Sequence, residues 1–423
     1  MHRLPDAIAE TLDLFVLLGA ERVPLSSATG RRLARDMVAR RPLPPYDASA
    51  MDGYAVRAED VRAATSDAPC ELSLAFSSPA GRPSDQSVGE GQAARVLTGS
   101  AVPKGADCVV IQEDVSIHGS KIHVRFAVKP RANIRHEGSD LVMDSVYLAK
   151  GSRLDAGAIA ILASQDVAMP EVRRRPVVAI LPTGDELRAI GDPETYGSIV
   201  DSNAPMLASL VEREGGIPRI LPIVGDSPDA IANAIGTNLD VDLVISTGGV
   251  SVGDHDYLPD ALGSLGATIR FRKVRMKPGK PVTVAEISGT PFVGLPGNPA
   301  SAMVGFELFV VPGLRAMQGD SAPFAAGEMV PLLHPLRRSM GRPELARGRL
   351  VPHLGHHAVD LTRSQGSGSL VALMQCDVLA LFSADTGALE AGTPVFCLPF
   401  GGPGSLAMSP LARRVELEDP PRG

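Results

Sequence analysis

Acidic residues follow three apolar runs that have the character of buried strands. Asp185 and Glu186 follow VVAILPTG, Asp226 follows ILPIVG, and Asp254 and Asp256 follow LVISTGGVSVG. Parallel strands end at the same edge of a sheet, so these carboxylates would converge and repel one another without a cation. Mg²⁺ binds one or two carboxylates with phosphate oxygens and water, so the pattern predicts magnesium-assisted chemistry at a phosphate. The alternative is that Asp185, Asp226 and Asp256 only cap the helices that follow.

A dense group of basic residues lies in the segment RKVRMKPGK of an otherwise acidic chain. Its members are Arg272, Lys273, Arg275, Lys277 and Lys280. If 273–277 is a strand, Lys273, Arg275 and Lys277 share one face, and the Pro-Gly turn would hold Lys280 in place. Such a patch is suited to bind an anion, and the alternative is a solvated, charged edge strand.

The sequence GLPGNPASA predicts a rigid turn that leads into a helix. Backbone N–H groups in the first turn of a helix bind tetrahedral oxyanions, although the same residues could serve only as a structural cap. The glycine loop TGGVSVG lacks the Gly-Lys-Ser/Thr of a Walker loop and does not match the dinucleotide-binding pattern, but its small residues let the backbone approach a phosphate closely. The candidate binding residues in these two segments are Gly248, Gly249, Ser251, Pro296, Asn298, Pro299 and Ser301.

Weaker signals lie in five other segments. PPYDASAMDGYAV places Asp52 in a turn-rich loop, LTGSAV places Thr98 after a strand, and IRHEGSD ends near Asp140. Each of these also has a plain explanation as a turn or a linker. GRPELARGR, which contains Arg342, and SQGSGSL, which contains Ser367, would together suit an oxyanion, but alone both are surface features.

Two sequence patterns along the chain indicate the elements that would position these residues. From about residue 176, apolar runs alternate with amphipathic segments such as 203–214, which is typical of a parallel sheet covered on both faces. Short strand-like runs between turns at 42–150, and again from 322 onward, indicate β-rich domains. Near the N-terminus, 5–19 has helical periodicity and Gly19 is a plausible stop. The apolar stripe of that helix would contain Ile8, Leu12, Phe15 and Val16.

We therefore predict a multidomain protein of the α/β plus β class. A three-layer α/β domain with a parallel sheet would span 171–318 and a small β-domain would span 322–412. An inserted β-rich domain would span 42–138. The N-terminal helix and an elongated linker domain would be formed by 1–41 together with 139–170.

Composition and charge exclude several classes of function. The chain of 423 residues has 41 Lys and Arg against 48 Asp and Glu, a net charge of −7, so it lacks the basic surplus of a nucleic-acid-binding protein. The cysteines form no C-x-x-C pair, which excludes a zinc cluster or a thioredoxin motif and fits a reducing compartment. Neither a signal peptide nor a run of 18 apolar residues is found. We therefore expect a cytoplasmic protein without a transmembrane helix.

Several strings, taken in order, resemble the molybdopterin molybdenumtransferase family, which includes the E domain of gephyrin. They are PPYDASAMDGYAV, LTGSAVPKGADCVV, ILPTGDEL, STGGVSVGDHDY, KPGKP and GLPGNPASA, and the resemblance spans about residues 1–410. It implies a four-domain homodimer whose cleft lies between subunits. It also implies Mg²⁺-assisted insertion of molybdate into the dithiolene of adenylylated molybdopterin, with release of AMP. The finished cofactor would pass to molybdoenzymes, and the adenylylating protein of the pathway is a further implied partner.

The resemblance also implies roles for individual residues. The positions that match catalytic residues are Asp52, Asp140, Glu186, Asp226, Asp256, Lys273 and Lys277, of which Glu186, Asp226 and Asp256 would hold Mg²⁺. The substrate-binding positions are Thr98, Gly248, Gly249, Ser251, Lys280, Pro296, Asn298, Pro299, Ser301, Arg342 and Ser367. Two alternatives stay open. A pterin-binding scaffold would not need the charged groups, and a nucleotide hydrolase on the same fold would lack the insert and the last β-domain.

Overall fold

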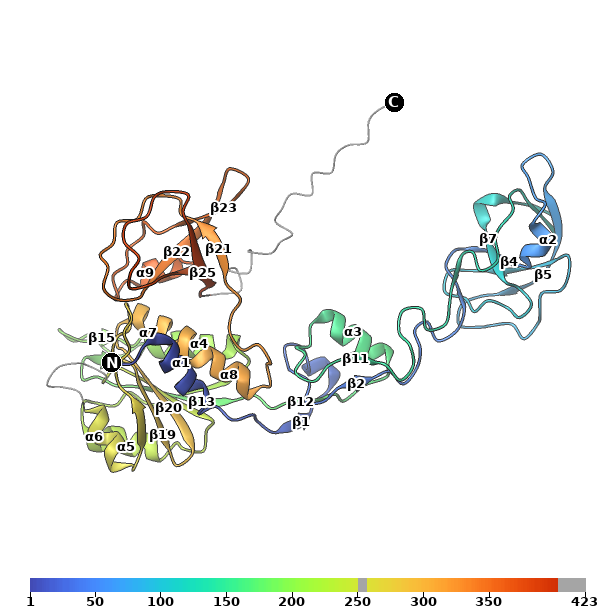
Figure 1. Ribbon diagram of the computed structural model, residues 1–423. Coiled ribbons are helices and arrows are strands. Elements are labelled where there is room, and N and C mark those ends of the chain that lie inside the picture. The colour runs from blue at the N-terminus through green and yellow to red at the C-terminus, as the bar shows by residue number, and fades with distance from the viewer. Residues whose placement is uncertain (250–256, 402–423) are drawn as a thin grey trace. The chain divides into compact units, whose positions relative to one another are not determined.

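The computed structural model describes residues 1–249 and 257–401, which form two compact units (Figure 1). The first unit contains Met1–Ala34, Gly151–Ala156 and the described residues from Met169 onward, and the second contains Arg35–Lys150 and Gly157–Ala168. Three residues named above, Ser251, Asp254 and Asp256, lie outside the described residues.

A six-stranded sheet forms the centre of the first unit, in the order β16-β13-β17-β20-β19-β18. The first four strands run parallel, whereas β19 and β18 at one edge run antiparallel to their neighbours. Strands β17 and β20 are buried along nearly their whole length, as expected for strands covered on both faces. The bounds are β13 Val177–Pro182, β16 Ile217–Ile220, β17 Leu243–Thr247, β18 Thr268–Phe271, β19 Thr283–Ile287 and β20 Thr290–Leu295.

Helices cover both faces of this sheet (Figure 1). Helices α5 and α6 pack on one face, and α1, α4, α7 and α8 pack on the other. A single π-helical turn, η3, joins α7 to α8. The bounds are α1 Leu4–Leu12, α4 Asn203–Arg213, α5 Pro228–Gly236, α6 Leu258–Ser264, α7 Pro299–Gly305, η3 Phe306–Val310 and α8 Val311–Met317.

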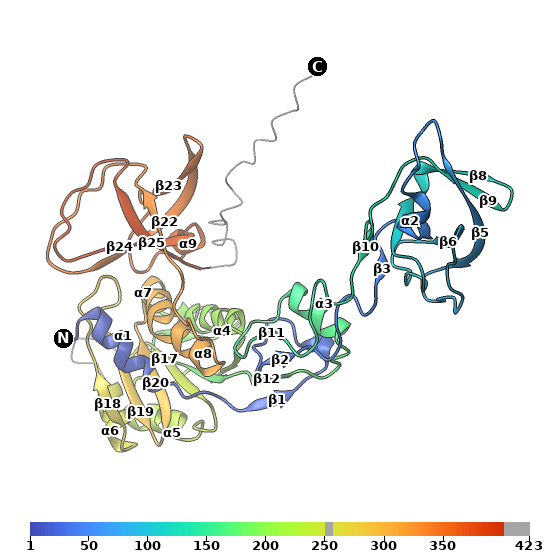
Figure 2. The same ribbon diagram turned by 45° about the vertical axis from the view of Figure 1, so that its right-hand side comes forward.

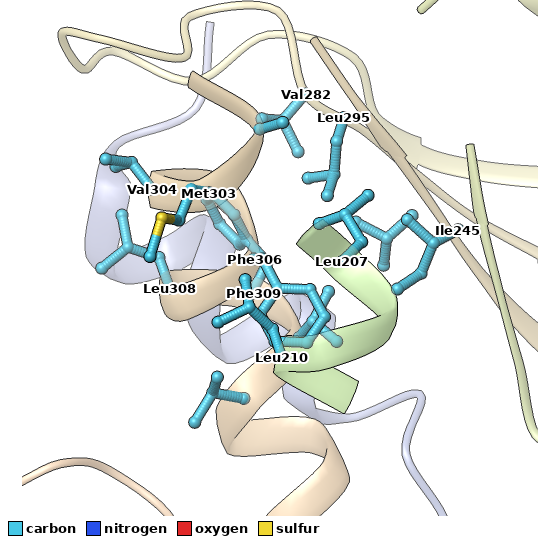
Figure 3. Close-up of a cluster of buried hydrophobic side chains, with 14 of the residues drawn as sticks. Leu207, Leu210, Ile245, Val282, Leu295, Met303, Val304, Phe306, Leu308 and Phe309 are labelled. Atoms are coloured by element: carbon cyan, nitrogen blue, oxygen red, sulfur yellow. The ribbon is translucent and has the colours of Figure 1, made fainter. Parts of the chain in front are cut away.

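The larger apolar core lies between the sheet and the long helix formed by α7, η3 and α8 (Figure 3). Leu207, Ile245, Leu295, Phe306 and Phe309 meet there, and each is at most 1% exposed. By length and composition this long helix could cross a membrane, although Glu307 and Arg315 interrupt its apolar residues. However, 83% of its most apolar stretch is buried inside the protein. Packing in the core therefore accounts for its apolar character.

The N-terminal helix is shorter than its periodicity predicts, since α1 ends at Leu12 rather than near Gly19. The chain leaves the helix because Phe15 packs against α8, where a Cβ added to Gly313 would lie 2.5 Å from the Phe15 ring. Val16, expected on the apolar stripe, is 68% exposed. Tertiary packing thus overrides the helical pattern after the third turn.

A five-stranded antiparallel sheet forms the C-terminal domain, in the order β21-β25-β24-β22-β23. The segment VALMQC, expected among the strands, begins instead with helix α9 (Leu370–Met374), because Ser369 caps it by accepting a hydrogen bond from the Ala372 N–H at 3.3 Å. Leu373 and Leu379 join the core beneath α7. The strands are β21 Glu328–Pro331, β22 Glu344–His353, β23 His356–Asp360, β24 Val378–Phe382 and β25 Pro394–Pro399.

The second unit is built around a six-stranded sheet in the order β7-β4-β6-β5-β9-β8 (Figure 2). Its core contains Tyr54, Val56, Val110, Ile122 and Val124. The strands of the sheet are β4 Gly53–Val56, β5 Cys70–Ser78, β6 Gln92–Val96, β7 Cys108–Ile111, β8 Val115–His118 and β9 Lys121–Val124. The other elements of this unit are β2 Met37–Val38, β3 Ala48–Ser49, α2 Ala58–Val61, η2 Gln112–Asp114, β10 Ile134–Arg135, β11 Val146–Leu148 and α3 Ala156–Ser164.

Four short strands complete the first unit. Strand β1 (Ala20–Arg22) pairs with β12 (Glu171–Arg173), and β14 (Leu187–Arg188) pairs with β15 (Ile199–Val200); the short helix η1 covers Leu25–Ser27. The predicted fold class, a multidomain α/β plus β protein, is confirmed. The four domain boundaries stay predictions.

The four cysteines are free thiols rather than disulfide partners. Cys108 and Cys397 are fully buried, and burial raises the pKa of each thiol to about 12. Thiols with such a high pKa are poor nucleophiles. Cys108 and Cys397 therefore pack as small apolar side chains.

Candidate functional site

Residues from four separate motifs meet around one cavity in the first unit. Lys277, Lys280, Ser301, Arg342 and Ser367 all line this cavity of about 350 Å³, and we call it the basic cavity. The rest of its lining consists of Met276, Pro278, Gly279, Pro281, Glu344, Leu345 and Gln365. Residues of the KPGKP, GLPGNPASA, GRPELARGR and SQGSGSL strings therefore lie together, although they are dispersed along the sequence.

The basic segment is not the strand that the sequence predicts. Strand β18 ends at Phe271, and 272–281 is irregular, with isolated bridges at Val274 and Lys277. Pro278 and Pro281 lack the N–H groups that would be needed to continue a strand beyond Lys277. Even so, the alternation holds in part, because Val274 and Met276 are fully buried while Lys273, Arg275 and Lys277 are exposed. Lys273 lies outside the basic cavity.

The start of α7 forms the floor of the basic cavity. Asn298 is the N-cap residue, and its carbonyl accepts from the Ala302 N–H at 2.9 Å. The Ala300 N–H donates to the Ser367 carbonyl at 2.9 Å, which ties the loop of the C-terminal domain to the first helical turn. Ser301 is only 5% exposed. The start of α7 and the loop that contains Ser367 therefore form one continuous side of the basic cavity.

One carboxylate balances part of this positive charge. Glu344 pairs with Lys277 at 2.8 Å and with Arg338 at 3.4 Å, and the Arg338 side chain also packs over the Phe382 ring. The sequence places Glu344 within a string of arginines but contains no signal for its pairing with Lys277. Sequence reasoning therefore missed Glu344, Arg338 and also Gln365.

A larger cavity of about 960 Å³ shares five residues with the basic cavity: Lys277, Lys280, Arg342, Glu344 and Gln365. Its remaining charged residues are Arg275, Arg337 and Arg338, and its apolar wall includes Leu336, Met340, Leu361 and Phe382. This volume is in the range that takes an organic molecule rather than an inorganic ion alone.

The glycine loop and the LPGNP turn are neighbours at the carboxyl edge of the sheet. Gly248 has φ +96°, its N–H donates to the Leu295 carbonyl at 3.2 Å, and an added Cβ would lie 2.1 Å from the Thr183 carbonyl. Only glycine fits there. The Asn203 side chain donates to the Thr247 hydroxyl at 2.8 Å and to the Gly297 carbonyl at 2.7 Å. Sequence reasoning missed Asn203.

The other candidate residues of the glycine loop and the LPGNP turn differ in burial and backbone conformation. Gly249 follows with φ +64°, and Pro296 is buried within the turn. Pro299 opens α7. The Asn203 Oδ1 atom is buried and has no hydrogen-bond partner among residues 1–249 and 257–401. A polar atom in this position is available to a ligand that reaches the sheet edge.

The described acidic residues, Asp185, Glu186 and Asp226, lie at the same sheet edge but line neither cavity. The Asp226 N–H donates to Asp185 Oδ1 at 3.0 Å, so these two residues are in contact. Glu186 folds back over Gly184, where an added Cβ would lie 2.4 Å from its Oε2. In the part of the chain that the structure describes, no three His, Cys, Asp or Glu residues are grouped to hold a metal ion. The convergence of the full acidic set, Asp254 and Asp256 included, stays a prediction.

The second unit contains Asp52, Thr98 and Asp140. The Thr98 N–H and hydroxyl donate to Asp52 Oδ1 at 2.7 and 2.8 Å, so the two motifs that contain them do meet. These two hydrogen bonds, the backbone one first, lower the pKa of Asp52. The Asp140 N–H donates to the Leu43 carbonyl at 2.9 Å. Nearby, Asp47 accepts from the Glu137 N–H at 2.8 Å, which joins the PPYDASAMDGYAV and RHEGSD segments.

Comparison with known proteins gives matches to three family models along the chain. Residues 2–165 match the MoeA N-terminal region (domains I and II), 179–316 match a probable molybdopterin binding domain, and 329–400 match the MoeA C-terminal region (domain IV). The molybdopterin molybdenumtransferase of Nostoc sp. is 38% identical over 386 residues, which cover 89% of this chain and 88% of the relative.

The chain belongs to the molybdopterin molybdenumtransferase family. The molybdopterin molybdenumtransferase of Staphylococcus epidermidis is 31% identical over 92% of this chain and 93% of that relative. A crystal structure of a molybdopterin biosynthesis moeA protein from Pyrococcus horikoshii matches with a TM-score of 0.81 and 30% identity, over 95% of this chain and all of that one. The resemblance seen in the sequence is confirmed.

Membership in the molybdopterin molybdenumtransferase family makes this chain a transferase of molybdenum cofactor biosynthesis that acts on molybdopterin. The molybdopterin-binding match at 179–316 contains the carboxyl edge of the sheet and the start of α7. The match at 329–400 contains Arg342 and Ser367. The basic cavity therefore lies where two matched domains of the family meet.

We expect the Thr98→Val variant to have a higher Asp52 pKa, because the hydroxyl donor that stabilises the carboxylate is lost. Only part of the shift should disappear, since the Thr98 N–H still donates. As the pH falls, Asp52 in the variant should therefore take up its proton at a higher pH than in the wild type. Carboxyl chemical shifts in Asp-labelled protein, followed against pH, measure this. Asp360, which accepts from Thr362 in another domain, is the internal control; an unchanged Asp52 titration would rule out the Thr98 contribution.

Proposed function

We propose that this protein catalyses Mg²⁺-dependent insertion of molybdate into adenylylated molybdopterin, with release of AMP. The observation that supports this most strongly is the basic cavity, in which Lys277, Lys280, Ser301, Arg342 and Ser367 surround a space suited to an oxyanion. A transferase that inserts a metal needs such a place for its oxometalate. We expect the protein to work in the cytoplasm.

The basic cavity provides the interactions that a tetrahedral dianion requires. Two ammonium groups and a guanidinium supply positive charge, and the Ser301 hydroxyl supplies a hydrogen-bond donor. The backbone that carries them is held by hydrogen bonds such as that from the Val274 N–H to the Lys280 carbonyl at 3.0 Å, so the charged groups are already close together before the anion arrives. Tungstate, which has nearly the same size and charge as molybdate, would meet the same groups in the cavity.

The Lys277–Glu344 ion pair reduces the net positive charge of the basic cavity. Lys277 is about half exposed whereas Glu344 is 18% exposed, so the carboxylate is the more fixed partner. When an oxyanion enters, the Lys277 ammonium is near enough to the cavity to contact both the anion and Glu344. Glu344 thereby keeps Lys277 at the cavity wall when no anion is bound.

The donor chemistry of the acidic residues fits magnesium. Asp185, Glu186 and Asp226 offer hard carboxylate oxygens at the exposed end of β13, and Asp185 uses only Oδ1 for the Asp226 N–H. We propose that Glu186 and Asp226, with Asp256 outside the described residues, hold the ion. When bound, Mg²⁺ neutralises charge on the adenylate phosphate and makes its phosphorus a better electrophile.

The remaining residues bind and orient the pterin substrate. The Gly248–Gly249 backbone and Asn298 lie between the acidic end of β13 and the start of α7. A substrate laid along this sheet edge would place its phosphate near the carboxylates and its dithiolene toward the basic cavity. Holding the pterin substrate and the molybdate close together in this way lowers the entropic barrier to insertion of the metal.

A homodimer is part of the proposal, because it offers a role for Asp52, Thr98 and Asp140. These residues belong to the second unit, and we propose that they complete the active site of the partner subunit. The hydrogen bonds from Thr98 keep Asp52 ionised, which suits it to act as an acceptor or an additional metal ligand. The product would then pass to recipient molybdoenzymes.

The reaction is tested by mixing the full-length protein with adenylylated molybdopterin, Mg²⁺ and molybdate, and following AMP by chromatography. The Lys280→Ala variant should need about tenfold more molybdate for half-maximal AMP release, because a charge-assisted contact is lost. Its affinity for the pterin should be unchanged. Lys150→Ala, which alters an exposed lysine of the second unit, is the control. Absence of AMP from the wild type would favour a non-catalytic scaffold, and AMP without molybdate uptake would favour a hydrolase.

The Asp226→Asn variant should bind adenylylated molybdopterin with nearly normal affinity and release AMP about 100-fold more slowly. The reason is that the carboxylate acts on the phosphate through the metal rather than on the pterin. Asp229→Asn, an exposed position in the first turn of α5, is the matched control. Equal losses of pterin binding and AMP release in Asp226→Asn would contradict a metal-holding role.

A further inference from the structure

The proposed function leaves the larger cavity without an occupant. An inorganic oxyanion fits the basic cavity of about 350 Å³, whereas the larger cavity of about 960 Å³ has room for an organic ring system. Its apolar wall, formed by Leu336, Met340, Leu361 and Phe382, does not extend into the lining of the basic cavity. Apolar side chains of this kind suit the face of a ring rather than a free ion.

Glu344 is the one acidic residue among the described residues that line the larger cavity. Its side chain is 18% exposed, with Oε1 2.8 Å from the Lys277 ammonium and Oε2 3.4 Å from Arg338 Nε. A carboxylate has about four acceptor sites. These two contacts therefore leave Glu344 able to accept from further N–H donors inside the cavity.

Arg338 is a firmly held partner for this carboxylate. Its side chain is only 4% exposed and packs over the Phe382 ring, with Cζ 5.4 Å from the ring centroid. Its guanidinium also donates to the carbonyls of Ser383 at 3.0 Å and Arg342 at 3.2 Å. The acceptor atoms of Glu344 therefore lie beside a fixed group, and they present a set pattern to a ligand in the cavity.

The order of the chemical groups in molybdopterin leads its ring toward the larger cavity. The dithiolene lies between the terminal phosphate and the pterin ring. The proposed function places the phosphate near the carboxylates at the end of β13 and the dithiolene toward the basic cavity, so the ring continues beyond the basic cavity. The larger cavity adjoins the basic cavity there, since five residues line both.

The edge of the pterin ring matches the polar groups of the larger cavity. The 2-amino group and the adjacent ring N–H are two neighbouring donors, and a carboxylate accepts such a pair with both oxygens, as it does from arginine. The neighbouring ring carbonyl is an acceptor. Arg337, which is exposed and lines the larger cavity but not the basic one, is a donor for that carbonyl.

We propose that the larger cavity binds the pterin ring of the substrate, with Glu344 accepting from the 2-amino group and the adjacent ring N–H while the apolar wall covers the ring face. This inference rests on the proposed function, since it takes the dithiolene to lie at the basic cavity. It also accounts for a carboxylate in a cavity whose other charged side chains are all basic among the described residues.

The first test measures molybdopterin binding and molybdate binding separately in the full-length protein, by anaerobic fluorescence titration and by calorimetry. Met340→Trp adds a bulky ring to the wall of the larger cavity, and Met340 does not line the basic cavity. We expect this variant to bind molybdopterin about tenfold more weakly and molybdate normally. Met329→Trp is the matched control, because Met329 is similarly exposed, at 61% against 68% for Met340, and lines neither cavity.

Glu344→Gln tests recognition of the donor edge. The variant keeps the size of the side chain but puts an N–H donor where the 2-amino group needs an acceptor. We expect it to bind free pterin about tenfold more weakly than the wild type. Lumazine, which has oxygen in place of the 2-amino group, should lose less affinity. Molybdate binding should not weaken, since a negative charge leaves the basic cavity. Glu328→Gln, at an exposed position of β21, is the control.

Melting curves establish whether each variant is folded, and the two variants test the site independently. Wild-type affinity for molybdopterin in a folded Met340→Trp, or an unchanged preference for pterin over lumazine in Glu344→Gln, would overturn the pterin site and leave the oxyanion site unaffected. A wild type that binds molybdopterin with the expected sensitivity to both substitutions, but binds no molybdate, would overturn the proposed function instead.

Discussion

The packing of the C-terminal β-domain against the long helix is the interaction on which the site depends. Leu345, Leu373 and Leu379 of that domain share one apolar core with Val282 and Met303. Across the same junction, the Lys277 N–H donates to the Pro343 carbonyl at 3.0 Å and the Leu345 N–H donates to the Lys277 carbonyl at 2.8 Å. Burial of apolar surface thus supplies the free energy that holds the basic segment beside Arg342 and Ser367.

That packing brings like charges together despite their mutual repulsion. Lys277, Lys280 and Arg342 would repel one another if they were free to move, and the fold holds them around a common space. Glu344 offsets part of the repulsion through its contacts with Lys277 and Arg338. The remaining positive charge is complementary to a dianion, and because the fold already places these residues around one cavity, binding does not require them to be gathered.

The sequence predicts much of this because its strongest signals are local. Apolar strands, amphipathic helices and the turn before α7 follow from short-range patterns, and the motif strings identify Lys277, Lys280, Ser301, Arg342 and Ser367. Features set by long-range packing were not predictable. Periodicity extends α1 past Leu12 because it takes no account of the Phe15–Gly313 contact.

The same reason explains the other errors and omissions. The expected strand over 273–277 is absent, and only the fold shows that Lys277 bridges to Glu344 instead. Glu344 and Asn203 have partners that are distant in sequence, so their neighbours in the chain give no signal. The described acidic residues follow strands, with Asp226 in contact with Asp185, but they do not line the basic cavity.

The most direct measurement is anomalous diffraction at the tungsten edge from crystals of the full-length protein soaked in tungstate. The account predicts an anomalous peak inside the basic cavity, within contact distance of Lys280, Ser301 and Arg342. A peak confined to the acidic end of β13, or an empty basic cavity in crystals that bind tungstate elsewhere, would contradict it.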